Sequence, residues 1–199
     1  MLNADVDGMG ITDCADSNVV MITDPFGSSY SYGPNPRFPG TAYVANYTLN
    51  GSYIYFNCYM WAIYKYNWTV SFNNPGYLTN VQWNSSMDVA RVAKLTTLDL
   101  QKLNCSILSC TTYMASVNAS NAKRIALRIN NSDYHFMTYT SFRGGSWWSF
   151  KAGASGPTLR TTNGLGPNSI DWLHYVYKDG KWQSQTPKYT SQIYYIAYK

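Results

Sequence analysis

Residues 134–151 contain two aromatic strand-like runs joined through a glycine pair, and this stretch restricts the possible folds more than any other. YHFMTYTSF (134–142) leads through Arg143-Gly144-Gly145-Ser146 into WWSFK (147–151). Gly-Gly between two strand-forming runs indicates a β-hairpin, because glycine readily adopts the positive φ angles of a tight turn. The stretch therefore predicts two neighbouring strands of an antiparallel sheet.

Further strand signals lie on both sides of this hairpin. KRIALRI (123–129) precedes it, separated by the turn sequence NNSD, and TSQIYYIAYK (190–199) closes the chain. WLHYVYKDGKWQS (172–184) has Asp-Gly at its centre, and TAYVANYTLNGSYIYF (41–56) has Asn-Gly, so each predicts another hairpin. The segment 154–169, rich in Gly, Pro, Ser and Asn, is expected to be a loop.

Two helices are predicted ahead of these later strands. From Cys58 to Tyr66 the chain is apolar or aromatic on nearly every face, which is typical of a buried helix, and Asn57 is a good N-cap. Residues 87–104 also have helical periodicity, with a break expected at Thr96–Thr97. Helices followed by antiparallel strands predict an α+β fold in which the helices pack on the sheet.

Length and composition indicate one domain with a short lead-in. Of 199 residues, 45% are apolar and 13% charged, enough to build a core. Residues 1–40, dense in Pro, Gly and Ser, are expected to be irregular, and residues 41–199 to form the α+β domain. Nothing in the sequence indicates the oligomeric state.

Charge and hydropathy exclude several classes of partner. The net charge is +5, and no basic run is longer than Lys123–Arg124, so a nucleic-acid-binding patch is not expected. No apolar run approaches the roughly 18 residues of a membrane span. Abundant Tyr, Asn, Ser and Thr favour a secreted or cell-surface protein whose signal peptide has been removed, over a cytosolic one.

Cysteine and histidine are too few for a metal site of ordinary spacing. The chain has two histidines, His135 and His174, and its cysteines include Cys105 and Cys110 in NCSILSC. That pair either closes a short disulfide loop or stays reduced, and a Cys14–Cys58 disulfide is a further alternative. No metal and no cofactor are expected.

Cys58 and His135 are the candidate catalytic pair. A cysteine in the first turn of a helix is more easily ionised, because backbone N–H groups there favour a negative charge. An imidazole that becomes imidazolium nearby lowers the thiol pKa further. The alternatives are that Cys58 is a packed core residue and that His135 only bonds to backbone.

The motifs around this pair resemble those of a group of small bacterial papain-like proteins. NCYMWA (57–62) resembles their N-C-Y-x-[YW]-A helix start, SDYHFMTY (132–139) their D-[FY]-H-[FW] strand, and WWSFKAG (147–153) their W-S-H-K-x-G return strand. The layout is more distantly similar to the NlpC/P60 and CHAP families. The resemblance covers about residues 50–160 and implies a papain-like fold with Cys58 as nucleophile and His135 as general base.

One departure from this pattern concerns the residue that orients the imidazole. Phe150 stands where the pattern has histidine. Ser149 on the return strand is then the expected third catalytic residue, with Lys151 and Asp133 as alternatives. Candidates for binding the oxyanion or substrate, taken from the same neighbourhood, are Asn57, Ser52 and Trp148.

Two functions remain open on this basis, beside a third reading that sets the motifs aside, in which the protein is a purely β-rich surface or structural protein. The first is a secreted thiol-dependent hydrolase or acyl transferase, a cysteine peptidase or amidase, acting on a peptide or cell-wall substrate. The second is a non-catalytic module of the same fold that binds cell wall, carbohydrate or a protein through aromatic side chains.

Overall fold

The structure is a computed structural model, and it describes a large part of the chain. The described residues are 19–21, 46–49, 52–55, 57–63, 74–114, 122–142, 145–151, 158–161, 165–178, 181–187 and 189–199. All statements below concern these residues. The predicted Asp179–Gly180 and Arg143–Gly144 turn residues and Cys14 lie outside them.

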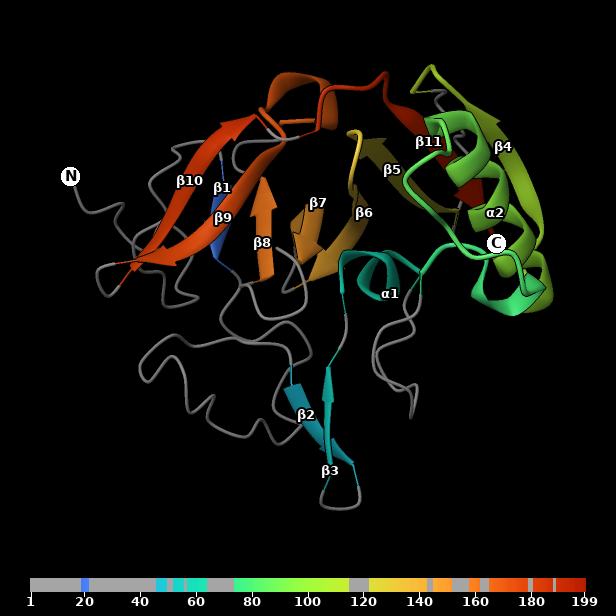
Figure 1. Ribbon diagram of the computed structural model, residues 1–199, viewed down its shortest axis with the longest axis horizontal. Coiled ribbons are helices and arrows are strands. Elements are labelled where there is room, and N and C mark those ends of the chain that lie inside the picture. Colours follow the sequence, from blue (N-terminus) through green and yellow to red (C-terminus); the bar gives the residue numbers. More distant parts are fainter. Residues whose placement is uncertain are drawn as a thin grey trace.

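An antiparallel sheet with the strand order β1-β8-β7-β6-β5-β11-β4 forms the centre of the fold (Figure 1). Its strands are β1 (Val19–Met21), β4 (Ile107–Thr111), β5 (Lys123–Ile129), β6 (Tyr134–Phe142), β7 (Gly145–Lys151), β8 (Thr158–Thr161) and β11 (Tyr194–Tyr198). Together with the helices, this sheet confirms the predicted α+β class. The hairpin predicted from residues 134–151 is β6–β7, paired from Thr138–Ser149 to Phe142–Gly145.

Two separate hairpins complete the strands. β2 (Asn46–Leu49) pairs with β3 (Ser52–Tyr55), and β9 (Leu173–Lys178) pairs with β10 (Lys181–Pro187). In each hairpin the innermost partners are separated by two residues, as the Asn-Gly and Asp-Gly sequences predict.

The helices are α1 (Cys58–Ala62), η1 (Tyr77–Thr79), α2 (Val89–Lys102) and η2 (Pro167–Ser169). The expected break in α2 at Thr96–Thr97 is wrong. The Thr96 hydroxyl donates to the Val92 carbonyl, and the Thr97 hydroxyl donates to the Lys94 carbonyl. Both threonines therefore bond to the preceding turn and are accommodated inside one continuous helix.

The two faces of the sheet carry different apolar layers, because side chains alternate along each strand. The helix face packs against α1 and α2 and is built from Ile125, Leu127, Ile129, Tyr134, Phe136, Ile196 and Tyr198. The opposite face carries an aromatic layer made of Met137, Trp148, Phe150, Tyr195, Trp172 and Tyr189, with smaller apolar residues between them. We call these the helix face and the aromatic face.

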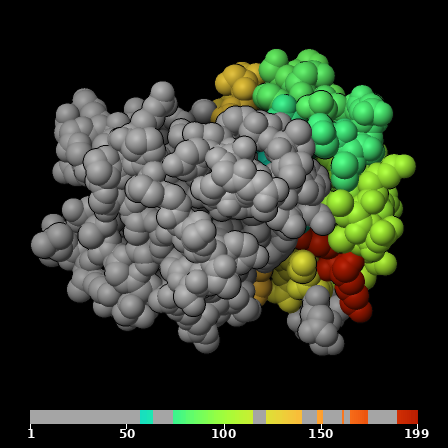
Figure 2. Space-filling model, turned by 90° about the horizontal axis from the view of Figure 1, so that it is seen from below, coloured from blue at the N-terminus to red at the C-terminus, as the bar shows by residue number. Residues whose placement is uncertain are grey.

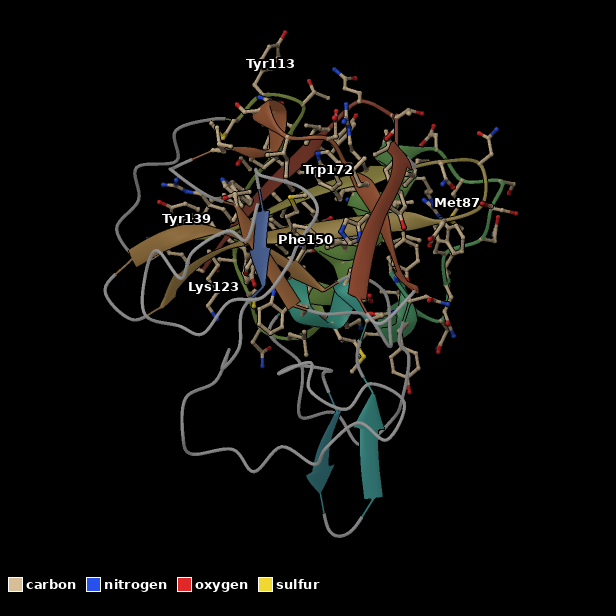
Figure 3. All side chains as sticks on the ribbon, turned by 90° about the vertical axis from the view of Figure 1, so that its left-hand side faces the viewer. Met87, Tyr113, Lys123, Tyr139, Phe150 and Trp172 are labelled. Carbon is tan, nitrogen blue, oxygen red and sulfur yellow. The ribbon has the colours of Figure 1, made fainter. Side chains whose placement is uncertain are left out.

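The helix face is covered near β4 and β11 by α2, as Figure 1 shows. Figure 2 shows the outer side of this region, where segment 74–114 (green to yellow-green) lies beside C-terminal residues (red). On the other side of the sheet, Phe150 and Trp172 lie inside the molecule, whereas Tyr113 points outward with 79% of its surface exposed (Figure 3).

Three strands were not expected from the sequence. β1 lies in the segment predicted to be irregular, β8 lies in the predicted 154–169 loop, and β4 follows the Cys105 region. β1 and β8 are short and pair with each other at one edge of the sheet, and β4 forms the other edge. Short edge strands carry weak sequence patterns, because their pairing partners supply much of their stability.

No helix among the described residues has both the length and the apolar character needed to cross a bilayer.

Candidate functional site

Cys58 is the first residue of α1, and Asn57 caps the helix. The Asn57 side-chain oxygen accepts a hydrogen bond from the Met60 backbone N–H at 3.0 Å, and the Asn57 carbonyl accepts from Trp61 N–H at 3.0 Å. The cap fixes the chain at the point where it begins to coil, and so fixes the position of the sulfur. Cys58 is buried, with 4% of its surface exposed.

Tyr134, the first residue of β6, links Cys58 to the rest of the site. The Cys58 thiol lies 3.8 Å from the Tyr134 carbonyl oxygen, in donor geometry. The Asn57 amide donates to the Tyr134 phenol oxygen at 3.2 Å, and that phenol donates to the Asn74 side-chain oxygen at 2.6 Å. The start of α1 is therefore tied to the start of β6, directly before His135.

His135 follows on β6, and its ring lies on the aromatic face, 3% exposed. It stacks on Tyr189 with ring centroids 5.0 Å apart and an interplanar angle of 18°. Phe150 and Trp172 meet it edge-on at 5.1 Å and 5.9 Å. Three aromatic rings thus surround the imidazole. The position at which the papain-like pattern has histidine, residue 150, is in direct contact with His135.

Tyr189 is close to both members of the predicted pair. Burial raises the pKa of its phenol above the usual value, and negative charge at Cys58, then at Asp133, raises that pKa further. The Tyr189 phenol donates to the Asp133 carboxylate at 2.7 Å. Since Tyr189 stacks on His135 and lies within electrostatic range of Cys58, it connects the two in space.

The Ser149 side chain lies on the helix face. Thr138 and Ser149 are register partners, and His135 is three positions before Thr138, so the two side chains point to opposite faces. The Ser149 hydroxyl accepts from the Trp61 indole N–H at 3.1 Å and donates to the Thr138 carbonyl at 3.4 Å. This register contradicts the prediction that Ser149 orients His135; Ser149 instead packs α1 onto the sheet.

The other predicted residues are placed as follows. Trp148 is on the aromatic face at 5% exposure, in contact with Tyr139 and Tyr195, so it belongs to the core and does not line a substrate surface as predicted. Ser52 lies in β3 opposite Leu49. The side chains of Ser52, Lys151 and His174 are outside the described part of the structure.

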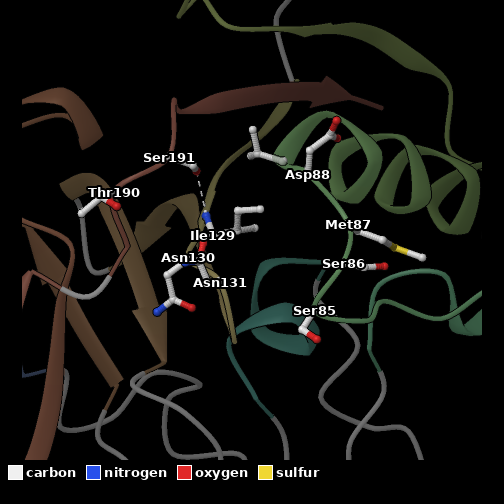
Figure 4. Close-up of a pocket in the computed structure, with 10 residues that line it drawn as sticks. Ser85, Ser86, Met87, Asp88, Ile129, Asn130, Asn131, Thr190 and Ser191 are labelled. Atoms are coloured by element: carbon white, nitrogen blue, oxygen red, sulfur yellow. Dashed lines mark hydrogen bonds between the residues drawn. The ribbon is translucent and has the colours of Figure 1, made fainter.

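A groove of about 430 Å³ opens beside this site (Figure 4). One wall is the entry to α2, another is the β5–β6 turn, and the third is the segment that follows Tyr189. Ser191 joins two walls: its hydroxyl accepts from the Ile129 N–H at 2.9 Å, the dashed line in Figure 4. The lining residues are Ser85, Ser86, Met87, Asp88, Val89, Ile129, Asn130, Asn131, Thr190 and Ser191.

The segments that line the groove are next in the chain to residues that contact the candidate pair. Thr190 directly follows Tyr189, and the β5–β6 turn leads into Tyr134. Trp83, just before the Ser85–Ser86 wall, meets the Tyr134 ring edge-on at 5.0 Å. The lining is mostly neutral hydroxyl and amide groups, which suits a ligand that exchanges hydrogen bonds.

The structure has no disulfide bond at the cysteines that it describes. Cys105 and Cys110 are free thiols, so the disulfide left open for them is not formed. Cys58 also keeps its thiol, which rules out a Cys14–Cys58 bridge in this structure. Among the described residues, no group of three or more His, Cys, Asp or Glu side chains is arranged to hold a metal ion.

Comparison with protein-family models, with curated proteins and with solved structures finds no match to this chain.

Tyr134, Tyr189 and Asn74 were missed from the sequence. Tyr134 had a signal, because it directly precedes His135 in the motif DYHF. Tyr189 and Asn74 had none: each lies in a loop-like stretch far along the chain from the residues it contacts, and tyrosine is too common here to stand out.

Proposed function

We propose that this protein is a papain-like thiol hydrolase or acyl transferase acting on a peptide or amide bond, with Cys58 as nucleophile and His135 as general base. The surroundings of Cys58 and His135 carry the proposal. The Cys58 thiol lies against the carbonyl of the residue that precedes His135, and Tyr189 stacks on His135 while the charge of Cys58 reaches its phenol.

In this mechanism the reaction begins with proton transfer from the Cys58 thiol to His135. The thiolate attacks the substrate carbonyl carbon, and the oxyanion that forms meets the backbone N–H of Cys58. Asn57 is the second candidate donor, since its amide nitrogen carries two hydrogens and donates to Tyr134. Both donors lie at a capped helix start, which keeps them fixed while charge develops.

The collapse of this intermediate breaks the C–N bond, and the imidazolium of His135 protonates the leaving amine. An acyl-thioester remains on Cys58. His135 then removes a proton from water, which attacks the thioester and restores the thiol; an amine or alcohol acceptor in place of water gives acyl transfer.

The groove supports a neutral, hydrogen-bonding substrate. Its hydroxyl and amide lining, with apolar contact from Met87 and Ile129, fits a peptide or a cell-wall polymer better than a strongly charged ligand. The tyrosine-rich, weakly charged composition supports an activity outside the cell or at its surface.

The proposal is tested by the pH dependence of Cys58 alkylation. Iodoacetamide is mixed with the full chain between pH 5 and 9, and modified peptides are counted by mass spectrometry. A thiolate–imidazolium pair predicts rapid labelling of Cys58 at pH 6 that His135→Ala slows on the order of tenfold or more. Cys105 and Cys110 serve as internal control thiols in the same sample.

The labelling of Cys58 would contradict the proposal if its rate rose only near pH 8.5, like an ordinary thiol, or if His135→Ala left it unchanged. Labelling of the urea-unfolded protein gives the rate of the accessible thiol, so that the two causes of slow reaction can be separated in the folded protein: burial lowers the rate at every pH, whereas the pKa sets the pH at which the rate rises.

A non-catalytic module of the same fold is the second candidate function, and three observations favour it. Phe150 offers His135 a ring edge and no hydrogen bond. The Cys58 thiol faces a carbonyl, which favours its protonated form. Both side chains of the pair are buried. In that case the groove is the binding site, and wild-type and Cys58→Ala proteins bind a cell-wall or peptide preparation equally well.

A further inference from the structure

We propose that Tyr189, anchored by Asp133, is the positioning residue for His135, in the role that the sequence assigned to Ser149. This inference rests on the proposed function, because a positioning residue has meaning only if His135 exchanges protons with Cys58. It is carried by the geometry of the aromatic face.

The imidazole of His135 is held in one plane by its neighbours. The near-parallel Tyr189 ring covers one side, and Phe150 and Trp172 meet it at interplanar angles of 82° and 88°. Rotation of the imidazole about its Cβ–Cγ bond would drive its edge into the Tyr189 ring. Tyr189 thus supplies by stacking the fixed orientation that a hydrogen-bonding third residue supplies in a triad.

Tyr189 is itself fixed at its phenol and at its backbone. Its O–H donates to one oxygen of Asp133, and the other oxygen of Asp133 accepts from the Tyr134 N–H at 2.8 Å. The Tyr189 N–H donates to the Trp172 carbonyl at 3.4 Å. The carboxylate therefore connects the Tyr189 ring to the backbone of β6, the strand that carries His135.

The charged groups around His135 determine how easily its imidazole is protonated. Arg128 is its register partner on β5 and disfavours a second positive charge. Asp133 and a Cys58 thiolate favour imidazolium. Tyr189 stays protonated, because burial raises the pKa of its phenol. The charges that act on the His135 imidazole therefore come from α1, from β5 and from the β5–β6 turn.

The position of the Tyr189 ring on His135 also explains how the site could work without a polar residue at position 150. Phe150 cannot accept a hydrogen bond, and Ser149 lies on the other face of the sheet. Tyr189 reaches the imidazole from a different part of the chain.

Graded variants of Tyr189 test this inference through the pH profile of Cys58 alkylation in the full chain. Tyr189→Phe keeps the stack and loses the anchor, so we expect the rate at pH 6 to fall about fivefold. Tyr189→Leu loses the ring as well, and we expect a fall on the order of 100-fold with the profile moved toward that of an ordinary thiol. Tyr195→Phe is the matched control: it removes a phenol hydrogen bond to Asn168 in the same aromatic layer and should leave the profile unchanged.

A double-mutant cycle tests the anchor. Asp133→Ala and Tyr189→Phe break the same hydrogen bond, so the double variant should label Cys58 no more slowly than the slower single variant. Independent, multiplying effects would overturn the anchor. Tyr189→Phe and the cycle keep the test decisive if Tyr189→Leu does not fold.

The outcomes separate the two proposals. A wild-type protein with an ordinary thiol profile contradicts the proposed function. A wild-type protein with rapid labelling at pH 6 that depends on His135, yet is insensitive to both Tyr189 variants, overturns the positioning role of Tyr189 and leaves the proposed function standing. An equal shift in Tyr195→Phe also overturns the role, because it would show a general effect of core packing.

Discussion

At the scale of single residues, the site depends on how Cys58 and His135 are held at the ends of two elements. Asn57 caps the helix start and also donates to Tyr134, so one side chain fixes both Cys58 and the strand that carries His135. The sulfur faces a carbonyl in this state. The proposed reaction therefore requires the thiol to turn from this carbonyl toward His135.

Phe150→His tests whether a polar third residue improves the pair. The Phe150 ring lies 5.1 Å from the His135 ring, so an imidazole there would offer a nitrogen acceptor to His135. We expect Cys58 alkylation at pH 6 to accelerate on the order of tenfold, because the acceptor orients His135 and stabilises its charged form. Phe150→Leu is the control for shape, and equal rates in the two variants would contradict the prediction.

The sequence predicts the residues of this site only where they lie in one motif. Cys58 and Asn57 are adjacent, and the six residues NCYMWA (57–62) are enough to predict a helix start with an asparagine cap. Ser149 was misassigned because the sequence shows its closeness to Phe150 but not the strand register, and a shift of one position moves a side chain to the other face. Tyr189 comes from a loop, where no periodicity restricts its direction.

At the scale of elements, a buried carboxylate joins α2 to η1 and α1. Asp99 accepts hydrogen bonds from the Tyr59 phenol, from Gly76 N–H at 2.7 Å and from Leu78 N–H at 3.0 Å. Burial raises the pKa of Asp99, while these donors oppose the rise. Gly76 is required at this point, since its φ is +89° and a Cβ would lie 2.0 Å from the Val81 carbonyl oxygen.

Tyr59→Phe should destabilise the protein through this carboxylate. The change removes a hydrogen bond to a buried charged group, so we expect a loss of about 1.5–3 kcal/mol in the free energy of unfolding at pH 7. The Tyr59 bond lowers the Asp99 pKa, so its contribution is present while Asp99 is ionised and disappears as the pH falls below that pKa. Urea denaturation at pH 7 and at lower pH measures both effects.

Tyr113→Phe is the control for Tyr59→Phe, because Tyr113 is largely exposed and should change stability by less than about 0.5 kcal/mol. A Tyr59→Phe penalty that stayed the same as Asp99 became protonated would contradict the assignment to this hydrogen bond.

Elements with strong local patterns were predicted well. β5 and β6 have the predicted bounds, because apolar residues recur along both runs and the polar turn NNSD separates them. α2 was expected to break at its two threonines, but their hydroxyls bond inside the helix. β8 was missed because four residues between Gly-rich and Asn-rich stretches give no clear pattern, and its pairing with β7 supplies the missing stability.

At the scale of the whole molecule, the central sheet separates two packed layers, and the candidate site has one residue in each layer. Cys58 packs with the helix face, whereas the His135 ring packs in the aromatic face. The two sides meet at the start of β6, where the Cys58 thiol contacts the strand backbone. The β5–β6 turn, which leads into β6, and the segment after Tyr189 both line the groove.

The order of strands in the sheet was not predictable from the sequence. β11, the C-terminal strand, lies between β5 and β4, so β4 joins the sheet by pairing with β11. Such non-local pairing leaves no local signal, since each strand pattern fits several neighbours. The α+β class was predictable because it depends on the types of elements and not on their order.

The titration of His135 measures the central claim most directly. The chain has two histidines, so the ring signals of His135 and His174 can be followed by NMR from pH 4 to 9, with His174 as internal reference. A Cys58 thiolate favours imidazolium, so we expect the His135 pKa to be lower in Cys58→Ala than in the wild type. Identical His135 titrations in wild type and Cys58→Ala would show that the two groups do not interact, and would contradict the account.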